Sequence, residues 1–167
     1  MTTSFFTNQD VVEIGPEHLD AVKKAAAASP LRRARWCLHG SHRDSVQEMI
    51  IAFCGDTYNR PHRHEGKSES FHVVEGRLLV ALFGDDGSVV RRIYLGPPGT
   101  GCNFVYRLSC PAWHAVVPLS DMTLIHETAA GPFDPGLTEF APWSPDVADP
   151  EGIHRFLGRL RDGAAAA

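Results

Sequence analysis

Three histidines and one glutamate are the residues of this sequence whose types and spacing could do chemistry: His62, His64, Glu69 and His114. Alternate residues of a β-strand point to the same face, so His62 and His64 can approach one ion while Arg63 points away. Imidazole nitrogens and a carboxylate oxygen suit a borderline or hard divalent cation. The four residues therefore predict a metal site.

The elements that must position this site follow from the distances along the chain. Glu69 comes after a short Glu-Gly-Lys-Ser turn and opens a strand that could return beside the strand of His62 and His64. His114 lies much further along, and a closed β-sandwich or barrel would bring its strand close. The site thus predicts a fold as well as a chemistry.

The middle of the chain has the pattern of an all-β domain. Turn signals occur at residues 84–87 (Gly-Asp-Asp-Gly) and 96–99 (Gly-Pro-Pro-Gly), between runs with the alternation of strands. Short strands at this spacing favour a sandwich or jelly roll over βαβ units. The expected strands are residues 46–53, 57–62, 69–75, 77–83, 89–95, 103–108, 113–117 and 122–128.

One short helix is expected on each side of this middle. Pro16 suits a first helical position, and alanines continue the helix to residue 28, before Ser-Pro ends it. The sequence Asp149-Pro150-Glu151 has the pattern of a second helix start. The apolar face of this second helix would hold Ile153, Phe156, Leu157 and Leu160. We expect an N-terminal helical segment at 1–30, a barrel at 31–145, and a short helix with a frayed tail at 146–167.

Composition restricts the partners. The chain has 167 residues, a net charge of -4 and a pI of about 6.1, so no basic surface predicts binding to nucleic acid or to an anionic membrane. The sequence contains neither a membrane-length apolar run nor a signal peptide. Its four cysteines form no Cys-x-x-Cys pair, which favours reduced thiols and a cytoplasmic location. The expected partner is a small-molecule substrate, and a homodimer is left open.

The spacing also resembles a known family. Gly55-x6-His62-x-His64-x4-Glu69-x6-Gly76 resembles the first cupin motif, with one extra residue before the first histidine, and Pro111-Ala-Trp-His114 resembles part of the second. More of the chain resembles the WbuC-type cupin-fold metalloproteins. The segments that carry this likeness are Leu31-Arg-Arg-Ala-Arg-Trp-Cys-Leu-His39, Val46-Gln47, Tyr58-x-Arg-Pro-His-Arg-His64, Trp113-His114 and Gly131-Pro-Phe-Asp.

The resemblance implies a small cupin-type jelly-roll β-barrel that binds one metal ion. It implies that His62, His64, Glu69 and His114 occupy the metal positions of the cupin motifs. Members of the family occur beside polysaccharide and natural-product biosynthesis genes. The resemblance does not imply one particular reaction.

Other residues are candidates for catalysis. If the strand before His62 is regular, Tyr58 and Arg60 share its face and could line the cavity, where they would orient a substrate or move protons. For Arg60 a salt bridge at the rim is an equal alternative. His126 lies on a strand that could pass the cavity, where it would act as an acid or base, orient a ligand, or have a structural role. Phe71 shares the face of Glu69 and would form a dry wall.

Five further residues have open roles. His39 and Gln47 belong to segments that resemble the family, and they would either orient a metal ligand or pair within the core. Arg32, Arg33 and Arg35 would form either a phosphate patch or a solvated cluster, and we favour the solvated cluster.

The same four ligands fit two kinds of metal site. Around tetrahedral zinc they close the site, which is the structural arrangement. Around an octahedral ion they leave two positions open for substrate or dioxygen. We expect one divalent ion per chain, with Fe favoured and Mn, Ni, Zn, Co and Cu as alternatives. The expected function is oxidative chemistry on a small polar metabolite. The alternatives are a Lewis-acid isomerase, lyase or decarboxylase, or a non-catalytic module that binds a small ligand such as a sugar.

Overall fold

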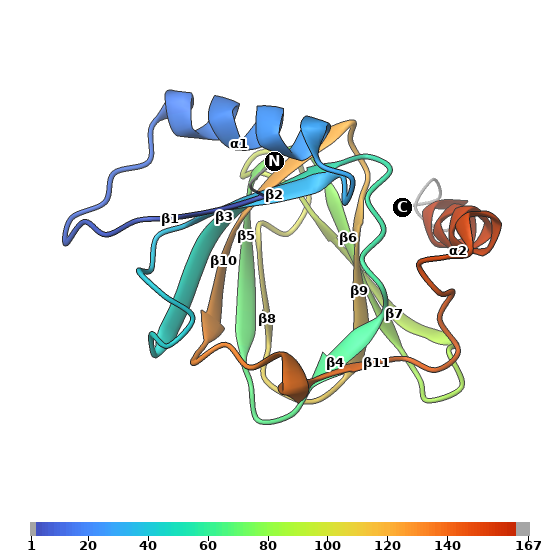
Figure 1. The fold of residues 1–167 in the computed structure, drawn as a ribbon. Coiled ribbons are helices and arrows are strands. Elements are labelled where there is room, and N and C mark those ends of the chain that lie inside the picture. The colour runs from blue at the N-terminus through green and yellow to red at the C-terminus, as the bar shows by residue number, and fades with distance from the viewer. Residues whose placement is uncertain (1–2, 163–167) are drawn as a thin grey trace.

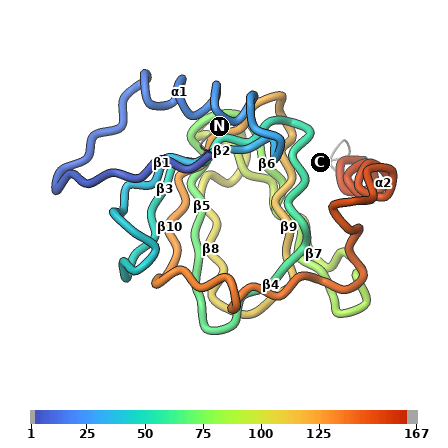
Figure 2. Tube along the Cα trace, in the orientation of Figure 1, coloured from blue at the N-terminus to red at the C-terminus, as the bar shows by residue number. Residues whose placement is uncertain are grey.

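Two β-sheets face each other in the computed structural model, which describes residues 3–162 (Figure 1). The first sheet has the order β1-β2-β3-β10-β5-β8 and the second has the order β11-β4-β9-β6-β7. The strands of the first sheet are β1 (Ser4–Phe6), β2 (Arg33–Cys37), β3 (Val46–Cys54), β10 (Met122–Ala130), β5 (Glu69–Glu75) and β8 (Val105–Leu108). Those of the second are β11 (Thr138–Phe140), β4 (His62–His64), β9 (Trp113–Pro118), β6 (Leu78–Phe83) and β7 (Val89–Leu95). The trace crosses between the two sheets several times, as a jelly roll does (Figure 2).

Alternation along the strands fills the space between the sheets. On β5, Phe71 and Val73 are buried in the central apolar cluster, whereas His72 between them is exposed. The dry wall predicted for Phe71 is confirmed. The central cluster also holds residues of β3, β6, β8, β9 and β10, among them Ile51, Val80 and Ile125. The barrel therefore has an apolar core that is built without any metal.

Helix α1 (Pro16–Ala28) lies on the outer face of the first sheet (Figure 1). Its fully buried residues Val22 and Ala26 pack in one cluster with Ile50 and Ala52 of β3. The predicted first helix is confirmed at the predicted residues. Pro16 occupies the first turn, where the missing N–H has no helical partner to lose.

Helix α2 (Pro150–Asp162) covers the outer face of the second sheet. Phe156, Leu157 and Leu160 are buried against Leu79 of β6 and Ala115 of β9. This apolar face is the one that the sequence predicted. Because α2 covers the outside and the barrel core lies inside, every residue of β9 is buried.

Two expectations about strands are wrong. The segment at residues 57–61 is irregular, and the strand there covers only His62–His64. Thr57 is fully buried, and its hydroxyl donates to the carbonyl oxygen of Arg32 at 2.5 Å, so this segment is held by side-chain contacts rather than by a ladder. Strands β1, β2 and β11 were not predicted. β1 and β11 have three residues each, too few for a periodic pattern.

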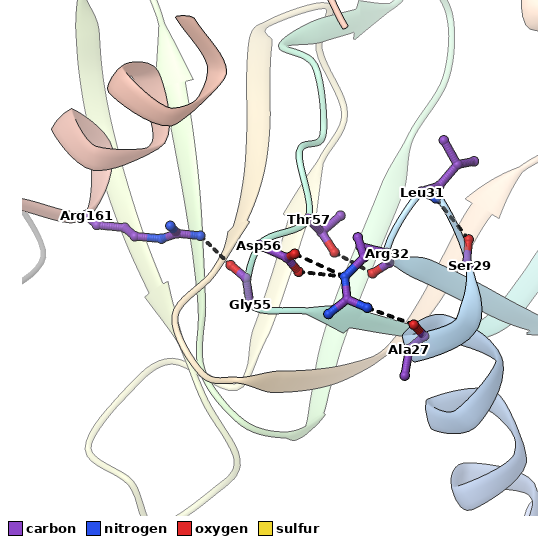
Figure 3. Close-up of polar contacts among 8 residues, drawn as sticks. All are labelled: Ala27, Ser29, Leu31, Arg32, Gly55, Asp56, Thr57 and Arg161. Atoms are coloured by element: carbon purple, nitrogen blue, oxygen red, sulfur yellow. Dashed lines mark hydrogen bonds and ion pairs between the residues drawn. The ribbon is translucent and has the colours of Figure 1, made fainter. Parts of the chain in front are cut away.

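Polar contacts join the ends of both helices to the loop after β3 (Figure 3). The guanidinium of Arg32, a residue with a positive φ of 55°, contacts Asp56 at 3.0 Å and donates to the carbonyl oxygen of Ala27 at 2.7 Å. Arg161 of α2 donates to the carbonyl oxygen of Gly55. Arg32 therefore has a structural role at the surface and does not belong to a cavity.

Residues 163–167, where the sequence predicts a frayed tail, lie outside the described residues. Within residues 3–162, the helices are too short and too polar to cross a membrane.

Candidate metal centre

The strand β4 places two histidines between two neighbouring strands. His62 pairs with His114 of β9 on one side and with Phe140 of β11 on the other. His64 pairs with Thr138 of β11. The two histidines alternate with Arg63, which instead pairs with a glutamate of β11 at the surface. Alternation on β4 and the register with β9 thus bring three imidazoles to one face, as the sequence predicted.

The three imidazoles converge with a carboxylate from the opposite sheet. One ligating atom from each of His62, His64 and His114 lies within 4.8 Å of the others. Glu69 of β5 reaches across, with its Oε1 3.0 Å from Nε2 of His114 and its Oε2 3.7 Å from Nε2 of His64. The structure therefore brings together all four residues that the sequence proposed as metal ligands.

Hydrogen bonds on the far side of the rings fix how two of them can bind. Nδ1 of His62 lies 2.8 Å from the carbonyl oxygen of Arg60, and Nδ1 of His114 lies 3.0 Å from that of Ala112. A carbonyl oxygen only accepts, so each Nδ1 must carry the proton and donate it. Each Nε2 is then left with a lone pair directed at the centre, which is the tautomer that binds a metal.

Two buried atoms of the centre lack hydrogen bonds. Nε2 of His114 and Oε1 of Glu69 are 3.0 Å apart, yet neither has a hydrogen-bond partner with acceptable geometry. A lone pair and a carboxylate oxygen, both buried, are unfavourable neighbours unless a metal ion or the proton of a charged imidazolium lies between them. The residues present therefore fit a divalent metal ion.

Burial and the neighbouring rings set the protonation states. Burial is the main cause that lowers the pKa of His62 to about 4, and the nearby His114 adds to it. Burial acts to raise the pKa of Glu69, but the neighbouring imidazoles, His114 foremost, lower it overall. A neutral His62 and an ionised Glu69 are the forms that ligate a cation.

The four residues form part of the wall of a cavity of about 330 Å³ between the two sheets. This volume is at the lower end of the range for small-molecule sites. Apolar side chains form most of the rest of the wall: Cys37, Met49, Ile51, Phe53, Phe71, Val116, Ile125, Phe133 and Phe140. The centre thus faces a cavity with room for a small molecule.

Several solved structures share the fold of this chain at low sequence identity. An oxalate oxidase in complex with the substrate analogue glycolate has a TM-score of 0.52 and 17% identity, over 74% of this chain and 62% of that one. A recombinant oxalate oxidase in complex with glycolate has a TM-score of 0.50 and 17% identity, over 70% and 58%. CapF, in complex with the inhibitor 3-isopropenyl-tropolone, has a TM-score of 0.52 and 19% identity, over 65% and 30%.

This chain has the cupin fold. It spans less than two thirds of the length of each of these proteins. In sequence, residues 14–95 match a domain of unknown function, DUF6016. No curated protein matches the chain in sequence. These likenesses establish the fold, and the activity is inferred below from the site.

Two predicted catalytic residues do not line the cupin cavity. Tyr58 donates from its hydroxyl to the carbonyl oxygen of Pro145 at 2.8 Å, and its ring packs against Phe156 of α2. Arg60 donates from Nε to the hydroxyl of Ser144 at 2.9 Å. The expected parity with His62 assumed a regular strand, and the irregular segment at 57–61 removes it. Both side chains hold the segment that leads into α2, so the structure corrects their predicted place.

His126 also lies outside the cavity. Its neighbours Ile125 and Glu127 line the cavity, so alternation along β10 turns His126 to the outer face of the sheet. There its Nε2 lies 2.8 Å from Oε1 of Glu48. Of the three roles that the sequence left open for His126, the structural one agrees with this position.

The residue that sequence reasoning missed is Glu127. Burial is the main cause that raises its pKa, to about 7, and the charge of Glu69 adds to it, while Arg35 acts in the opposite direction. A carboxyl group with a pKa near neutrality in a cavity is a candidate proton donor or acceptor. Ile125 is an apolar residue in the middle of a strand and is therefore expected to face the interior. Glu127, two residues later, shares that face, and this spacing could have identified it.

The raised pKa of Glu127 predicts a pH-dependent effect on stability. In the metal-free protein, the folded state keeps this proton up to pH of about 7, whereas the unfolded chain loses it from about pH 4.5. Over this pH window, the free energy of unfolding of the wild-type chain therefore falls relative to that of a variant with a neutral side chain at position 127. We expect Glu127→Gln to raise the free energy of unfolding by about 1–2 kcal/mol at pH 8 and to leave it unchanged near pH 4.

Urea unfolding at both pH values, in the presence of a chelator, measures this effect. Glu13→Gln, at an exposed glutamate on the loop before α1, is the matched control, for which we expect the same small difference at both pH values. A Glu127→Gln effect that does not change with pH would contradict the account.

Residues with open roles take different places in the cupin barrel. His39 and Gln47 line the cavity but contact no predicted ligand. The side-chain amide of Gln47 donates to the carbonyl oxygens of Ser41 and Asp44, at 3.2 and 2.9 Å, and so supports the loop before β3. Arg33 and Arg35 face the cavity, so the expectation that they belong to a solvated cluster is wrong.

Thr138 supports the third imidazole. Its hydroxyl lies 3.1 Å from Nδ1 of His64, and the same ring has a hydrogen bond with the backbone of Leu137. Removing a hydrogen-bond partner of a ligand typically costs about 10- to 100-fold in metal affinity. Because Leu137 remains, we expect Thr138→Val to weaken metal binding about tenfold, measured by competition with a chromogenic chelator. Thr123→Val, at a buried threonine of β10 that bonds only the carbonyl oxygen of Arg77, should leave the metal affinity unchanged.

Proposed function

We propose that this chain is a mononuclear metal-dependent enzyme that acts on a small polar metabolite. The observation that carries the proposal is the convergence of three imidazoles and Glu69 on the wall of a cavity of about 330 Å³. A metal that served only the fold would not need this space. The fold has its own apolar clusters, between the sheets and beneath each helix, so a structural ion is not required to hold it.

When bound, such an ion supplies Lewis acidity or a centre for dioxygen activation. The residues of the chain do the rest. The carbonyl oxygens of Arg60 and Ala112 hold two imidazoles in the ligating tautomer, and the apolar part of the wall gives a substrate a surface to pack against. Glu127 holds a proton within the cavity, where it can be transferred to or from a substrate.

Oxidative chemistry on iron is the reaction that we favour. Three histidines and one carboxylate leave two positions open around an octahedral ion, which suits a substrate and dioxygen side by side. The similarity of the fold to that of an oxalate oxidase is compatible with this choice. The resemblance to the WbuC-type proteins would place the reaction in natural-product or polysaccharide biosynthesis.

Glu127 favours a second candidate, a Lewis-acid isomerase, lyase or decarboxylase. These reactions need a proton donor or acceptor beside the substrate and no dioxygen, and a carboxyl with a pKa of about 7 meets that need. A non-catalytic module that binds a sugar is the third reading. It gives no role to a proton-exchanging carboxyl in the cavity.

Metal analysis separates a catalytic ion from a structural one. We expect the purified protein to hold one iron, manganese, nickel or cobalt ion per chain by mass spectrometry. A chelator should remove the ion and leave the circular dichroism spectrum unchanged. Zinc whose removal unfolds the chain would instead indicate a structural site. Dioxygen consumption with candidate substrates then divides the oxidative reaction from the Lewis-acid one.

A further inference from the structure

Two arginines of β2 face the cupin cavity without a carboxylate of residues 3–162 within ion-pair distance. Arg33 and Arg35 line the cavity, while Ala34 between them is buried on the outer face against α1. Within residues 3–162, the arginines that form ion pairs with carboxylates are Arg32, Arg60, Arg63 and Arg155.

The Nε of Arg33 is buried with no hydrogen-bond partner, and its Nη1 reaches the side-chain oxygen of Asn59 only at 3.4 Å. A buried donor on a charged group that lacks an acceptor is unfavourable. Arg33 therefore needs an acceptor for its Nε that residues 3–162 do not provide.

The charges around the cavity do not balance. Its lining holds three permanent cations, Arg33, Arg35 and Lys67, and two carboxylates, Glu69 and Glu127. Glu69 belongs to the metal centre, where a divalent ion would exceed its charge. The pKa of Glu127, about 7, leaves that carboxyl partly protonated at neutral pH. The cavity thus has an excess of positive charge, which an anionic ligand would neutralise.

The positions of these groups define a ligand with two ends. Arg33 reaches toward Asn59, which precedes His62 by three residues, so the arginines and the histidines face the same space. In the first sheet, β3 and β10 separate β2 from β5, and their inward residues Ile51 and Ile125 form an apolar floor between the two poles. A ligand that fills the cavity would touch the guanidinium groups, the apolar floor and the histidines.

We propose that Arg33 and Arg35 bind the carboxylate of a small organic acid, whose apolar body lies on this floor and whose other end reaches the histidines. The fork of a guanidinium matches a planar carboxylate with two parallel hydrogen bonds. Phosphate sites often use glycine-rich loops, and the described residues that line this cavity include no glycine. The role of the second end rests on the proposed function, whereas carboxylate binding at the arginines does not.

Calorimetry on the chelator-treated protein tests the proposal, because no metal then competes for the probe. The probes are benzoate, its neutral isostere benzamide, and phenyl phosphate. We expect benzoate to bind at least about tenfold more tightly than either of the others. We also expect Arg33→Gln and Arg35→Gln each to weaken benzoate binding about tenfold or more. Arg92→Gln, at an exposed arginine of β7, should leave it unchanged.

Equal binding of benzoate and benzamide, or no binding of benzoate, would overturn the proposal without any variant having to fold. Stronger binding of phenyl phosphate would overturn the carboxylate in favour of a phosphate. Metal content, measured on the same samples before chelation, keeps this test apart from the proposed function. A chain that binds benzoate but never holds a metal would refute the metal enzyme and leave the anion site standing.

Discussion

The His114→Ala variant is expected to bind the metal more than about 100-fold more weakly than the wild-type chain. Loss of a residue that merely hydrogen-bonds a ligand costs about 10- to 100-fold, and His114 is itself a proposed ligand. Its side chain is fully buried, its Nε2 faces Glu69 at 3.0 Å, and its ring is 4.4 Å from that of His62 between centroids. His126 cannot supply a substitute nitrogen, since it lies on the outer face of the sheet.

Metal content by mass spectrometry and affinity by chelator competition measure this loss. His126→Ala is the matched control and should keep the metal. Because His114 is deeply buried, His62→Ala serves as a second variant at a more accessible position and should lose the metal while the circular dichroism spectrum is retained. If His114→Ala and His62→Ala both fold and keep stoichiometric metal, the proposed centre is wrong.

The Leu157→Ala variant is expected to lower the free energy of unfolding by about 3 kcal/mol. Leu157 is 5% exposed and packs, with Phe156 and Leu160, onto the outer face of the second sheet. Truncating a buried leucine to alanine usually costs about 2–5 kcal/mol, since both the burial and the packing are lost. This cluster lies on the opposite side of β9 from the metal centre, so the metal affinity of the folded variant should not change.

Urea unfolding of the metal-free protein gives the stability, and chelator competition gives the affinity. Leu31→Ala is the control, because that leucine is 59% exposed, and its effect should stay within about 0.5 kcal/mol. A loss of metal binding in a folded Leu157→Ala variant would contradict the separation of fold stability from the site. A loss of stability as small as that of the control would contradict the packing of α2.

The parts that the sequence predicted well are those with a complete local signal. The first helix begins at Pro16, whose ring suits that position. On β5, the alternation of Glu69, Phe71 and Val73 correctly predicted which side chains face inward. A strand of seven residues is long enough to show its period of two clearly. His62 and His64 were placed correctly because their spacing alone defines a face, even on a strand of three residues.

The parts that were wrong depend on contacts that no local pattern contains. Tyr58 and Arg60 were assigned to the cavity on the assumption that the alternation of His62 and His64 continues toward the N-terminus. The chain there is instead held by bonds to residues 144–146, more than eighty positions away. On β10, residue type favoured His126 over its neighbour Glu127, although apolar Ile125 marks the inward parity.

Charge was the other misleading signal. Arg32, Arg33 and Arg35 look alike in sequence, as a basic cluster at the surface. Arg32 has a positive φ and lies just before β2, which begins at Arg33. Alternation along β2 then turns Arg33 and Arg35 into the cavity, while Arg32 stays at the surface with Asp56. Only the assembled sheet shows that two of these charges have no carboxylate of residues 3–162 within ion-pair distance.

An anomalous-difference map of crystals of the metal-loaded protein, recorded at the absorption edge of the bound metal, tests the central claim most directly. The account predicts one peak per chain, among Nε2 of His62, His64 and His114 and a carboxylate oxygen of Glu69. A peak that lies elsewhere, or a stoichiometrically loaded protein with no peak among these four side chains, would contradict it.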